Sequence, residues 1–195
     1  MLAAVILSGG SSSRMGSPKA LLPYQGRPFL EHLLEVTKHA KIGARRVVLG
    51  AHAGPIANAI RVPAEEIVIN EDWEKGQLSS IHAGLRSLPA GTHGMVLCLI
   101  DHPLISAGLV NDLIAAFYES KAPIVVPVYE GRRGHPVLFG ARLYGELLAA
   151  PLEVGARSVV WAHTSEVVEV ATTEEGCVLN LNDPETFRRV TNSVE

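Results

Sequence analysis

The sequence predicts an α/β fold with a doubly wound, mostly parallel sheet that carries helices on both faces. Short aliphatic runs of strand length alternate along the chain with segments of helical period, as in parallel strands joined by crossover helices. A Gly-rich segment directly follows the first run, as in Rossmann-like folds, whose ligands bind at the carboxyl ends of the strands. The 195 residues, 47% of them hydrophobic, suit one domain spanning residues 1–195.

The first half of the chain alternates between the two patterns. Strands are expected where short aliphatic runs occur, at residues 3–7, 47–49 and 67–69. Helices are expected where apolar positions repeat with helical period, at residues 29–40, 56–60 and 79–88. Gly43 is a stop signal for the first of these helices, and Ser79 is a suitable N-cap for the third.

The second half continues the alternation. Further strands are expected at residues 95–100, 124–128 and 167–170. Further helices are expected at residues 109–118, 143–149 and 159–162. The run at 95–100 is apolar throughout, which is typical of a central buried strand, and it leads into Asp101. Pro184 is suited to begin a last helix, which the side chain of Asp183 can cap.

Composition and charge indicate a cytoplasmic protein. The net charge of −3 gives no general attraction to nucleic acid or to an anionic membrane, so neither is an expected partner. No basic segment precedes a signal-type apolar run, and no apolar run has transmembrane length. Cys98 and Cys177 form no C-x-x-C pattern and are expected to stay reduced.

The segment LSGGSSSRMGSPKALL, residues 7–22, has the residues of a phosphate-binding loop. Gly9 and Gly10 allow a sharp turn that brings backbone N–H groups close to an anion, and Ser11 follows them. Arg14 offers a planar fork and Lys19 a point charge, which are complementary ways to hold a triphosphate. The segment therefore predicts a nucleotide site.

The spacing excludes two common nucleotide motifs. Gly16 is followed by Ser17 and Pro18, so the segment is not a P-loop. The glycines do not make the G-x-G-x-x-G pattern of a dinucleotide site either. The remaining alternative is an ordinary Gly/Ser loop that carries surface cations.

Two oxygen-bearing segments are candidates for a Mg²⁺ site. Asp101 stands at the tip of a buried strand, where a carboxylate needs a partner such as a divalent cation that bridges phosphates. The alternative is that Asp101 caps the next helix. His102 is expected to pack or hydrogen-bond, because Mg²⁺ prefers oxygen. In the segment LNLNDPETF, the amide oxygens of Asn180 and Asn182 are potential ligands.

Two further segments have an ordinary structural alternative. Asn70, Ser79 and Ser80 could hold a base edge, a ribose or a phosphate, although their spacing alone favours an N-capped helix with an acidic loop. In GRRGHPVLF, Arg133 and His135 flank Gly134 before an apolar strand. With Arg132 they could bind a second anionic ligand, or they could form a basic surface turn.

Together these segments resemble the MobA-like nucleotidyltransferases, and among them the MocA-type cytidylyltransferases that complete molybdenum cofactor. The resemblance covers nearly the whole chain through the motifs RMGSPKALL, GQLSSIHAGL, DHP, RGHPVLF and NLNDPE. It implies a fold of the nucleotide-diphospho-sugar transferase type in a single MobA-like domain over residues 1–195. The opening Ser-Gly-Gly departs from the usual Ala-Ala-Gly of cytidylyltransferases and Ala-Gly-Gly of guanylyltransferases.

The resemblance implies roles for individual residues. The triphosphate would be held by Gly9, Gly10, Ser11, Arg14 and Lys19, with Asn70, Ser79 and Ser80 near the nucleotide. Mg²⁺ would be held by Asp101 and Asn182, and the second substrate would face Arg133, Gly134 and His135. Lys19 would stabilise the α-phosphate and Arg14 the departing phosphates, so that Arg14, Lys19 and Asp101 are the catalytic residues.

The implied reaction moves a nucleoside monophosphate from an NTP, with CTP favoured, to a phosphate-bearing acceptor, with molybdopterin favoured, and releases pyrophosphate. A molybdoenzyme or its chaperone is the implied protein partner. One alternative keeps the chemistry with GTP, or with a sugar or polyol phosphate as acceptor. The other is a catalytically silent nucleotide-binding regulator, which the intact cationic loop and Asp101 disfavour.

Overall fold

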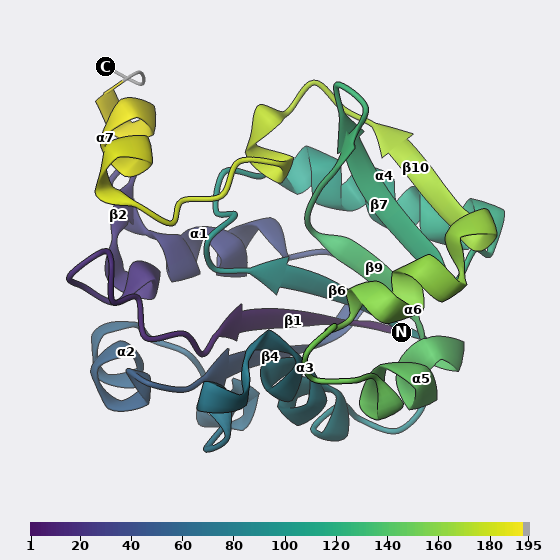
Figure 1. Cartoon of the computed structure of the whole chain (residues 1–195), viewed down its shortest axis with the longest axis horizontal. Coiled ribbons are helices and arrows are strands. Elements are labelled where there is room, and N and C mark those ends of the chain that lie inside the picture. The colour runs from purple at the N-terminus through teal and green to yellow at the C-terminus, as the bar shows by residue number, and fades with distance from the viewer. Residues whose placement is uncertain (193–195) are drawn as a thin grey trace.

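A computed structural model describes residues 1–192, and a twisted sheet runs through its centre (Figure 1). The strands of this sheet are β1 (Leu2–Ser8), β4 (Ile42–Leu49), β5 (Ile67–Ile69), β6 (Gly94–Leu99), β7 (Ile124–Tyr129), β8 (Arg132–Arg133), β9 (Val137–Gly140) and β10 (Val167–Ala171). Their order is β10-β7-β9-β6-β1-β4-β5, and β8 pairs with β7. A separate hairpin joins β2 (Pro23–Tyr24) to β3 (Arg27–Pro28).

The sheet is mostly parallel, as the sequence predicted. β1 lies between β4 and β6 and is parallel to both, while β5 extends the parallel order beyond β4. β9 is antiparallel to both of its neighbours, β6 and β7, and β10 pairs parallel with β7. The carboxyl ends of β1, β4 and β6 therefore meet at one edge, where the site-forming loops begin.

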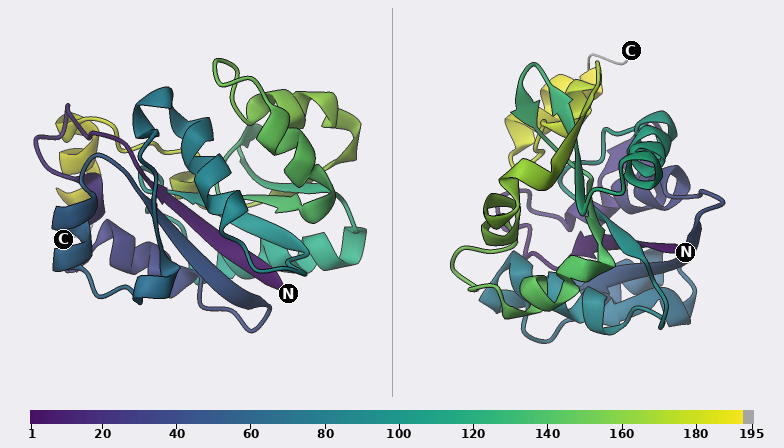
Figure 2. Two further views of the ribbon diagram at one scale, coloured as in Figure 1. Left: turned by 90° about the horizontal axis from the view of Figure 1, so that it is seen from below. Right: turned by 90° about the vertical axis from the view of Figure 1, so that its right-hand side faces the viewer.

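Helices cover both faces of the sheet (Figure 2). They are α1 (Phe29–Val36), α2 (Ala53–Ala59), α3 (Gln77–Arg86), α4 (Ala107–Ser120), α5 (Tyr144–Ala149), α6 (Arg157–Ala162) and α7 (Pro184–Asn192). One hydrophobic cluster contains buried residues of α1, α2 and α4, and the other contains buried residues of α3, α5 and α6. This two-faced arrangement confirms the doubly wound prediction. Among residues 1–192, no helix has the length and apolar character needed to cross a membrane.

Alternation along the central strand builds both cores at once. In β1, Leu2 and Ile6 belong to the cluster under α1 and α4, whereas Val5 and Leu7 belong to the cluster under α3. All four side chains are at most 5% exposed. Since burying one large aliphatic side chain contributes roughly 1.5–3 kcal/mol, β1 anchors the sheet from both sides.

Several predicted helix boundaries were wrong. The helices expected at residues 56–60 and 159–162 begin earlier, at Ala53 and Arg157. The helix that begins at Phe29 ends at Val36, four residues before the predicted end at residue 40. Ser79 is the third residue of α3 and not its N-cap, because the helix begins at Gln77 after Gly76, whose φ of +92° favours glycine. The Ser79 hydroxyl donates to the carbonyl of Gly76 at 2.7 Å and also to that of Asp72.

The last described helix lies beside the loop that follows β1, although the two are distant in sequence (Figure 1). The rings of Phe29 in α1 and Phe187 in α7 meet edge-on with centroids 5.8 Å apart. Asp183 caps α7 as predicted, because its carboxylate accepts from the backbone N–H of Thr186 at 2.8 Å. The sheet edge that carries the Gly-rich loop after β1 is therefore also flanked by the segment around Asn182.

Candidate functional site

A cleft of about 220 Å³ opens at the carboxyl ends of β1 and β6. Its lining includes Gly9, Gly10, Lys19, Ser80 and Asp101. The first glycine is required by close packing, because a Cβ on Gly9 would lie 2.7 Å from the Ser80 hydroxyl oxygen. A Cβ on Gly10 would have no neighbour within 4 Å, so that glycine faces open space.

A smaller polar cavity of about 130 Å³ lies on the other side of Lys19. It is lined by residues of the loop and one of the closing segment: Ser11, Ser12, Ser13, Arg14, Met15, Lys19 and Asn182. Ser12 and Lys19 line both spaces. We call the cleft and this cavity together the polar trough. Arg14 lines its smaller part, and Lys19 lies where the two parts join.

Lys19 is the hub of this trough. Its ammonium donates a hydrogen bond to Oδ1 of Asn182 and lies 4.0 Å from Oδ2 of Asp101. Burial lowers the pKa of Lys19, and the nearby Arg14 lowers it further, whereas Asp101 and Asp183 act in the opposite direction. The side chain is 12% exposed, so its charge is poorly screened by solvent.

A backbone contact brings Asn182 to Asp101. The N–H of Leu181 donates to the carbonyl of Asp101 at 2.8 Å, and the Leu181 side chain is fully buried. The helix after Asp101 has its own cap, because the Ser106 hydroxyl accepts from the Leu109 N–H at 3.1 Å. Asp101 is therefore not the cap of α4, which leaves its carboxylate available to the cleft.

The pair of oxygens fits a hard divalent cation. The carboxylate of Asp101 and the amide oxygen of Asn182 both face the ammonium of Lys19. The two oxygens therefore already surround a positive charge. Mg²⁺ is commonly held by one or two protein oxygens together with substrate phosphates. Within residues 1–192 no cluster of three His, Cys, Asp or Glu side chains is arranged for a metal.

Asn70, Ser79 and Ser80 form a buried polar network at the base of the cleft. The Asn70 side-chain N–H group donates to the hydroxyl oxygens of Ser79 at 2.9 Å and Ser80 at 3.0 Å. Its carbonyl oxygen accepts from the N–H of Asp72 at 3.1 Å. The network fixes the loop after β5 onto α3, and of the three residues only Ser80 lines the cleft.

The residues of the basic turn, 131–135, lie in different surroundings. Arg133 is ion-paired with Glu169 of β10 at 2.7 Å, and it lines neither part of the trough. Gly134 packs against backbone, because a Cβ there would lie 2.3 Å from the Cys177 carbonyl oxygen. The backbone N–H of His135 donates to that same carbonyl at 2.8 Å.

His135 meets His102 beside the cleft. Their ring centroids are 5.0 Å apart, and Nδ1 of each ring is buried without a hydrogen-bond partner among residues 1–192. Burial lowers the pKa of His135 to about 4, so the ring is neutral at pH 7. Burial also lowers the pKa of His102, more strongly than the nearby Asp101 carboxylate raises it.

Several lining residues were not predicted. Ile56, Trp73 and Gln77 contribute to the cleft wall. Gln77 lies in the GQLSS motif beside the predicted serines, which was the signal available for it. Trp73 lies in a short 3₁₀ turn, and no periodicity marks such a turn in the sequence.

Comparisons with known proteins agree with this geometry. The family model described as the MobA-like NTP transferase domain matches residues 4–167. The molybdenum cofactor guanylyltransferase of Vibrio atlanticus is 31% identical over 186 residues, which cover 93% of this chain and 91% of that protein. The nicotine blue oxidoreductase of Paenarthrobacter nicotinovorans is 33% identical over 150 residues, or 71% of each protein.

A solved structure has the same fold over its full length. Rv0371c from Mycobacterium tuberculosis superimposes with a TM-score of 0.86 at 27% identity, covering 98% of this chain and 99% of that one. A structure of the same protein in complex with manganese gives a TM-score of 0.78. The chain therefore belongs to the family of MobA-like NTP transferase domains, and it is a nucleotidyltransferase of the nucleotide-diphospho-sugar transferase fold.

Proposed function

We propose that this protein transfers GMP from GTP to the phosphate of molybdopterin and releases pyrophosphate. The observation that carries the proposal is the Lys19 ammonium, which lies between Asp101 and Asn182 where the two parts of the polar trough join. GTP is favoured because a relative named molybdenum cofactor guanylyltransferase matches 93% of the chain. CTP, favoured by the sequence resemblance, is the second nucleotide to test.

The reaction is an in-line displacement. An oxygen of the acceptor phosphate forms a bond to the α-phosphorus of GTP, and the bond from that phosphorus to the bridging oxygen of the β-phosphate breaks. Pyrophosphate leaves with the electron pair. The attacking phosphate is already an anion, so catalysis rests on positioning and on neutralising charge and not on a strong base.

Four side chains divide this work. Lys19 would stabilise the α-phosphate, and its position in the lining of both the cleft and the smaller cavity supports this role. Arg14 lines the smaller cavity and would bind the departing β- and γ-phosphates. Asp101 and Asn182 would hold the divalent cation, which supplies Lewis-acid neutralisation of the phosphate oxygens. Lys19 must release these two oxygens as it turns toward the α-phosphate.

Pyrophosphate release tests the proposal. The protein is assayed with Mg²⁺ and each of GTP, CTP, ATP and UTP, against molybdopterin and a panel of sugar and polyol phosphates. Release with GTP and molybdopterin is the expected result. Release with CTP instead would keep the chemistry and change the nucleotide. Binding of an NTP without release for any acceptor would overturn the proposal in favour of a silent nucleotide-binding regulator.

The relative named nicotine blue oxidoreductase favours a second candidate, a redox reaction on a planar dye-like substrate. It is tested by following the absorbance of NADH or NADPH in the presence of nicotine blue. Dye-dependent oxidation of either nucleotide without pyrophosphate release would favour this candidate. The cationic trough around Lys19 and Arg14 favours nucleotidyl transfer, because that reaction requires neutralisation of a triphosphate.

A further inference from the structure

The turn between β4 and α2 packs against the Gly-rich loop that follows β1 (Figure 1). This turn consists of residues 50–52, and its first residue has no room for a side chain. A Cβ on Gly50 would lie 2.4 Å from the carbonyl oxygen of Gly9 and 2.6 Å from the Cβ of Trp73. The backbone of the 50–52 turn therefore lies directly against the backbone of the loop.

Two hydrogen bonds join the 50–52 turn to the loop, and the acceptor in each is a backbone carbonyl of the loop. The N–H of Ala51 donates to the carbonyl of Gly9 at 3.1 Å. The Nε2 atom of the His52 ring lies 2.7 Å from the carbonyl oxygen of Ser11. A carbonyl oxygen can only accept, so Nε2 carries the proton and donates the hydrogen bond. The turn thus holds the carbonyls of two alternate loop residues.

The His52 side chain is available for this contact because it does not cap its own helix. It directly precedes α2, which begins at Ala53, but within residues 1–192 its side chain makes no cap hydrogen bond to that helix. The ring reaches across to the loop instead, and it lines neither the cleft nor the smaller cavity. His52 can therefore act on the polar trough only through the loop that it holds.

Peptide planarity turns these two contacts into a direction for the N–H groups of the loop. In a trans peptide unit, the carbonyl of one residue and the N–H of the next point in opposite directions. The carbonyls of Gly9 and Ser11 face the 50–52 turn. The N–H groups of the residues that follow them, Gly10 and Ser12, therefore face away from it.

Those two N–H groups are suited to bind an anion. Gly10 and Ser12 both line the cleft, and neither N–H has an acceptor among residues 1–192. Unpaired backbone N–H groups that gather in a loop form a concave site for phosphate oxygens. The contacts of the 50–52 turn therefore direct two such donors toward the polar trough.

The conformation of Ser12 requires support from its surroundings. Its φ of +51° lies in the left-handed region, which residues other than glycine rarely adopt. Its hydroxyl oxygen accepts from the N–H of Lys19 at 3.1 Å, and its carbonyl accepts from the N–H of Met15 at 2.9 Å. Both of these contacts are made within the loop segment. The bond from His52 to the preceding residue connects this strained part of the loop to the turn after β4.

We propose that His52 is a positioning residue for the triphosphate, because its ring keeps the N–H groups of the Gly-rich loop directed toward the polar trough. This inference rests on the proposed function, which places a nucleoside triphosphate in that trough. Without the ring, the carbonyl of Ser11 loses its partner, and the peptide unit between Ser11 and Ser12 is free to rotate. The N–H of Ser12 then points toward the phosphates for only part of the time. The affinity for the triphosphate falls, because the loop is no longer preorganised, while the fold persists.

The direct test is calorimetric titration of the full chain with GTP and with inorganic tripolyphosphate, both in the presence of Mg²⁺. Tripolyphosphate carries no base, so it reports on the phosphate-binding loop alone. His52→Ala should weaken the binding of both ligands about tenfold, which is the size of one lost hydrogen bond to a charged group. His52→Gln keeps an N–H donor of similar reach and should restore binding to within about threefold of wild type.

His39→Ala is the matched control. His39 is half-buried like His52, and its ring also bonds to the backbone, since Nδ1 accepts from the N–H of Lys41 at 2.9 Å. It lines neither the cleft nor the smaller cavity, so its removal should leave the binding of both ligands unchanged. Urea unfolding should show that His52→Ala and His39→Ala fold with stabilities close to that of wild type.

Steady-state kinetics adds a result that a general loss of stability would not produce. In His52→Ala the KM for GTP should rise about tenfold, while kcat and the KM for molybdopterin stay within about threefold of wild type. A fall in kcat with an unchanged KM for GTP would contradict a role in positioning the bound triphosphate.

The binding data can overturn the inference in several ways. Equal affinities of His52→Ala and wild type would show that the loop holds its N–H groups without the ring. Equally weak binding by His52→Ala and His52→Gln would show that the donated hydrogen bond is not the cause. A loss of GTP affinity without a loss of tripolyphosphate affinity would assign His52 to the base. Absence of tripolyphosphate binding by the wild type would also contradict the inference.

The outcomes also separate this inference from the proposed function. Tripolyphosphate binding that depends on His52, without any nucleotidyl transfer, would support the positioning role and contradict the proposed reaction. Transfer to molybdopterin with a KM for GTP that is unaffected in His52→Ala would support the reaction and contradict the positioning role.

Discussion

The ammonium of Lys19 donates a hydrogen bond to the side-chain oxygen of Asn182, which lies 163 positions further along the chain. The same ammonium lies 4.0 Å from the Asp101 carboxylate. Lys19 therefore holds the two candidate metal ligands together before any cation binds. A cation that takes these oxygens must displace the lysine, and the displaced lysine is then free to meet the nucleotide.

Replacement of this lysine should separate metal binding from catalysis. In Lys19→Met, Mn²⁺ binding without nucleotide should become tighter, because the competing ammonium is gone, while turnover should fall about a hundredfold or more. Calorimetric titration with Mn²⁺ measures the first effect, and pyrophosphate release measures the second. Lys38→Met is the control, since Lys38 forms an exposed ion pair with Glu35. Weaker Mn²⁺ binding by Lys19→Met would contradict the competition.

Substitutions at the two candidate Mg²⁺ ligands should shift the Mg²⁺ concentration for half-maximal rate in opposite directions. Asp101→Asn removes the carboxylate and should raise the Mg²⁺ concentration for half-maximal rate, whereas Asn182→Asp adds one and should lower it. The double variant preserves the total charge and should return toward wild type. The measurement is pyrophosphate release across a Mg²⁺ series. The same Mg²⁺ dependence in all three variants would remove both residues from the metal site.

Close packing at the first glycine predicts a stability difference between two neighbouring substitutions. Gly9→Ala places a Cβ 2.7 Å from the Ser80 hydroxyl oxygen and should cost about 1–3 kcal/mol of unfolding free energy. Gly10→Ala meets nothing within 4 Å and should be near neutral. Urea unfolding measures both. Gly9→Ala should cost less in a Ser80→Ala background than in wild type, because the clashing hydroxyl is then absent. Equal stability of the Gly9→Ala and Gly10→Ala variants would refute the clash.

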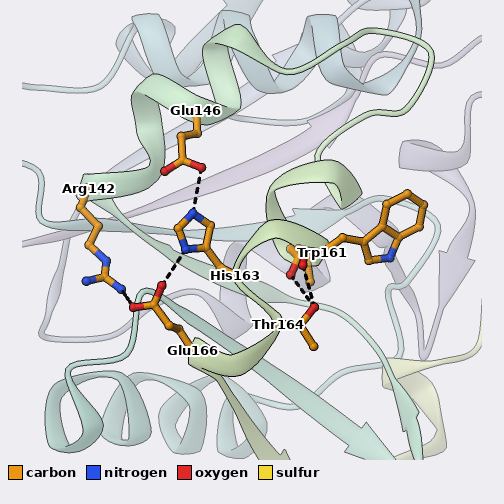
Figure 3. A network of polar contacts seen from close by, with 7 residues as sticks. Arg142, Glu146, Trp161, His163, Thr164 and Glu166 are labelled. Atoms are coloured by element: carbon orange, nitrogen blue, oxygen red, sulfur yellow. Dashed lines mark hydrogen bonds and ion pairs between the residues drawn. The ribbon is translucent and has the colours of Figure 1, made fainter.

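The network of His163 with Glu146 and Glu166 (Figure 3) predicts a pH dependence of stability. The hydrogen bonds to Glu166 and Glu146 raise the pKa of His163 above its ordinary value of 6.5. The stabilisation is thus fully present below the unfolded-state pKa and is lost as the pH rises through the folded-state pKa. Wild type should exceed His163→Gln in urea resistance at about pH 6 and lose that advantage by about pH 9. An advantage that grows with pH would contradict this sign.

The fold was largely predictable because alternating burial leaves a clear pattern. The continuous apolar run that forms β6 predicts a buried strand, and the helical period of the segment that forms α4 predicts a helix. The direction of β9 was not predictable, since the short run Val137–Gly140 is apolar in either orientation. The early end of the helix at Val36 also had no clear signal, because the apolar period continues past it.

The site was predictable in part for a similar reason. Residues at strand ends, such as Gly9 and Asp101, gather wherever parallel strands share an edge. The contact of Lys19 with Asn182 depends on how the segment after β10 returns to the sheet, which no local pattern encodes.

The bond from the Leu181 N–H to the Asp101 carbonyl joins a late segment of the chain to the residues that follow β6. Ribosomes deliver the chain from its amino end, so all the strands described emerge before Asn182 does. A nascent chain that stalls after β10 has its sheet and its Gly-rich loop but lacks one of the two oxygens that face Lys19. Under the proposed mechanism such a chain lacks one candidate metal ligand, so we expect nucleotidyl transfer only after synthesis has passed Asn182.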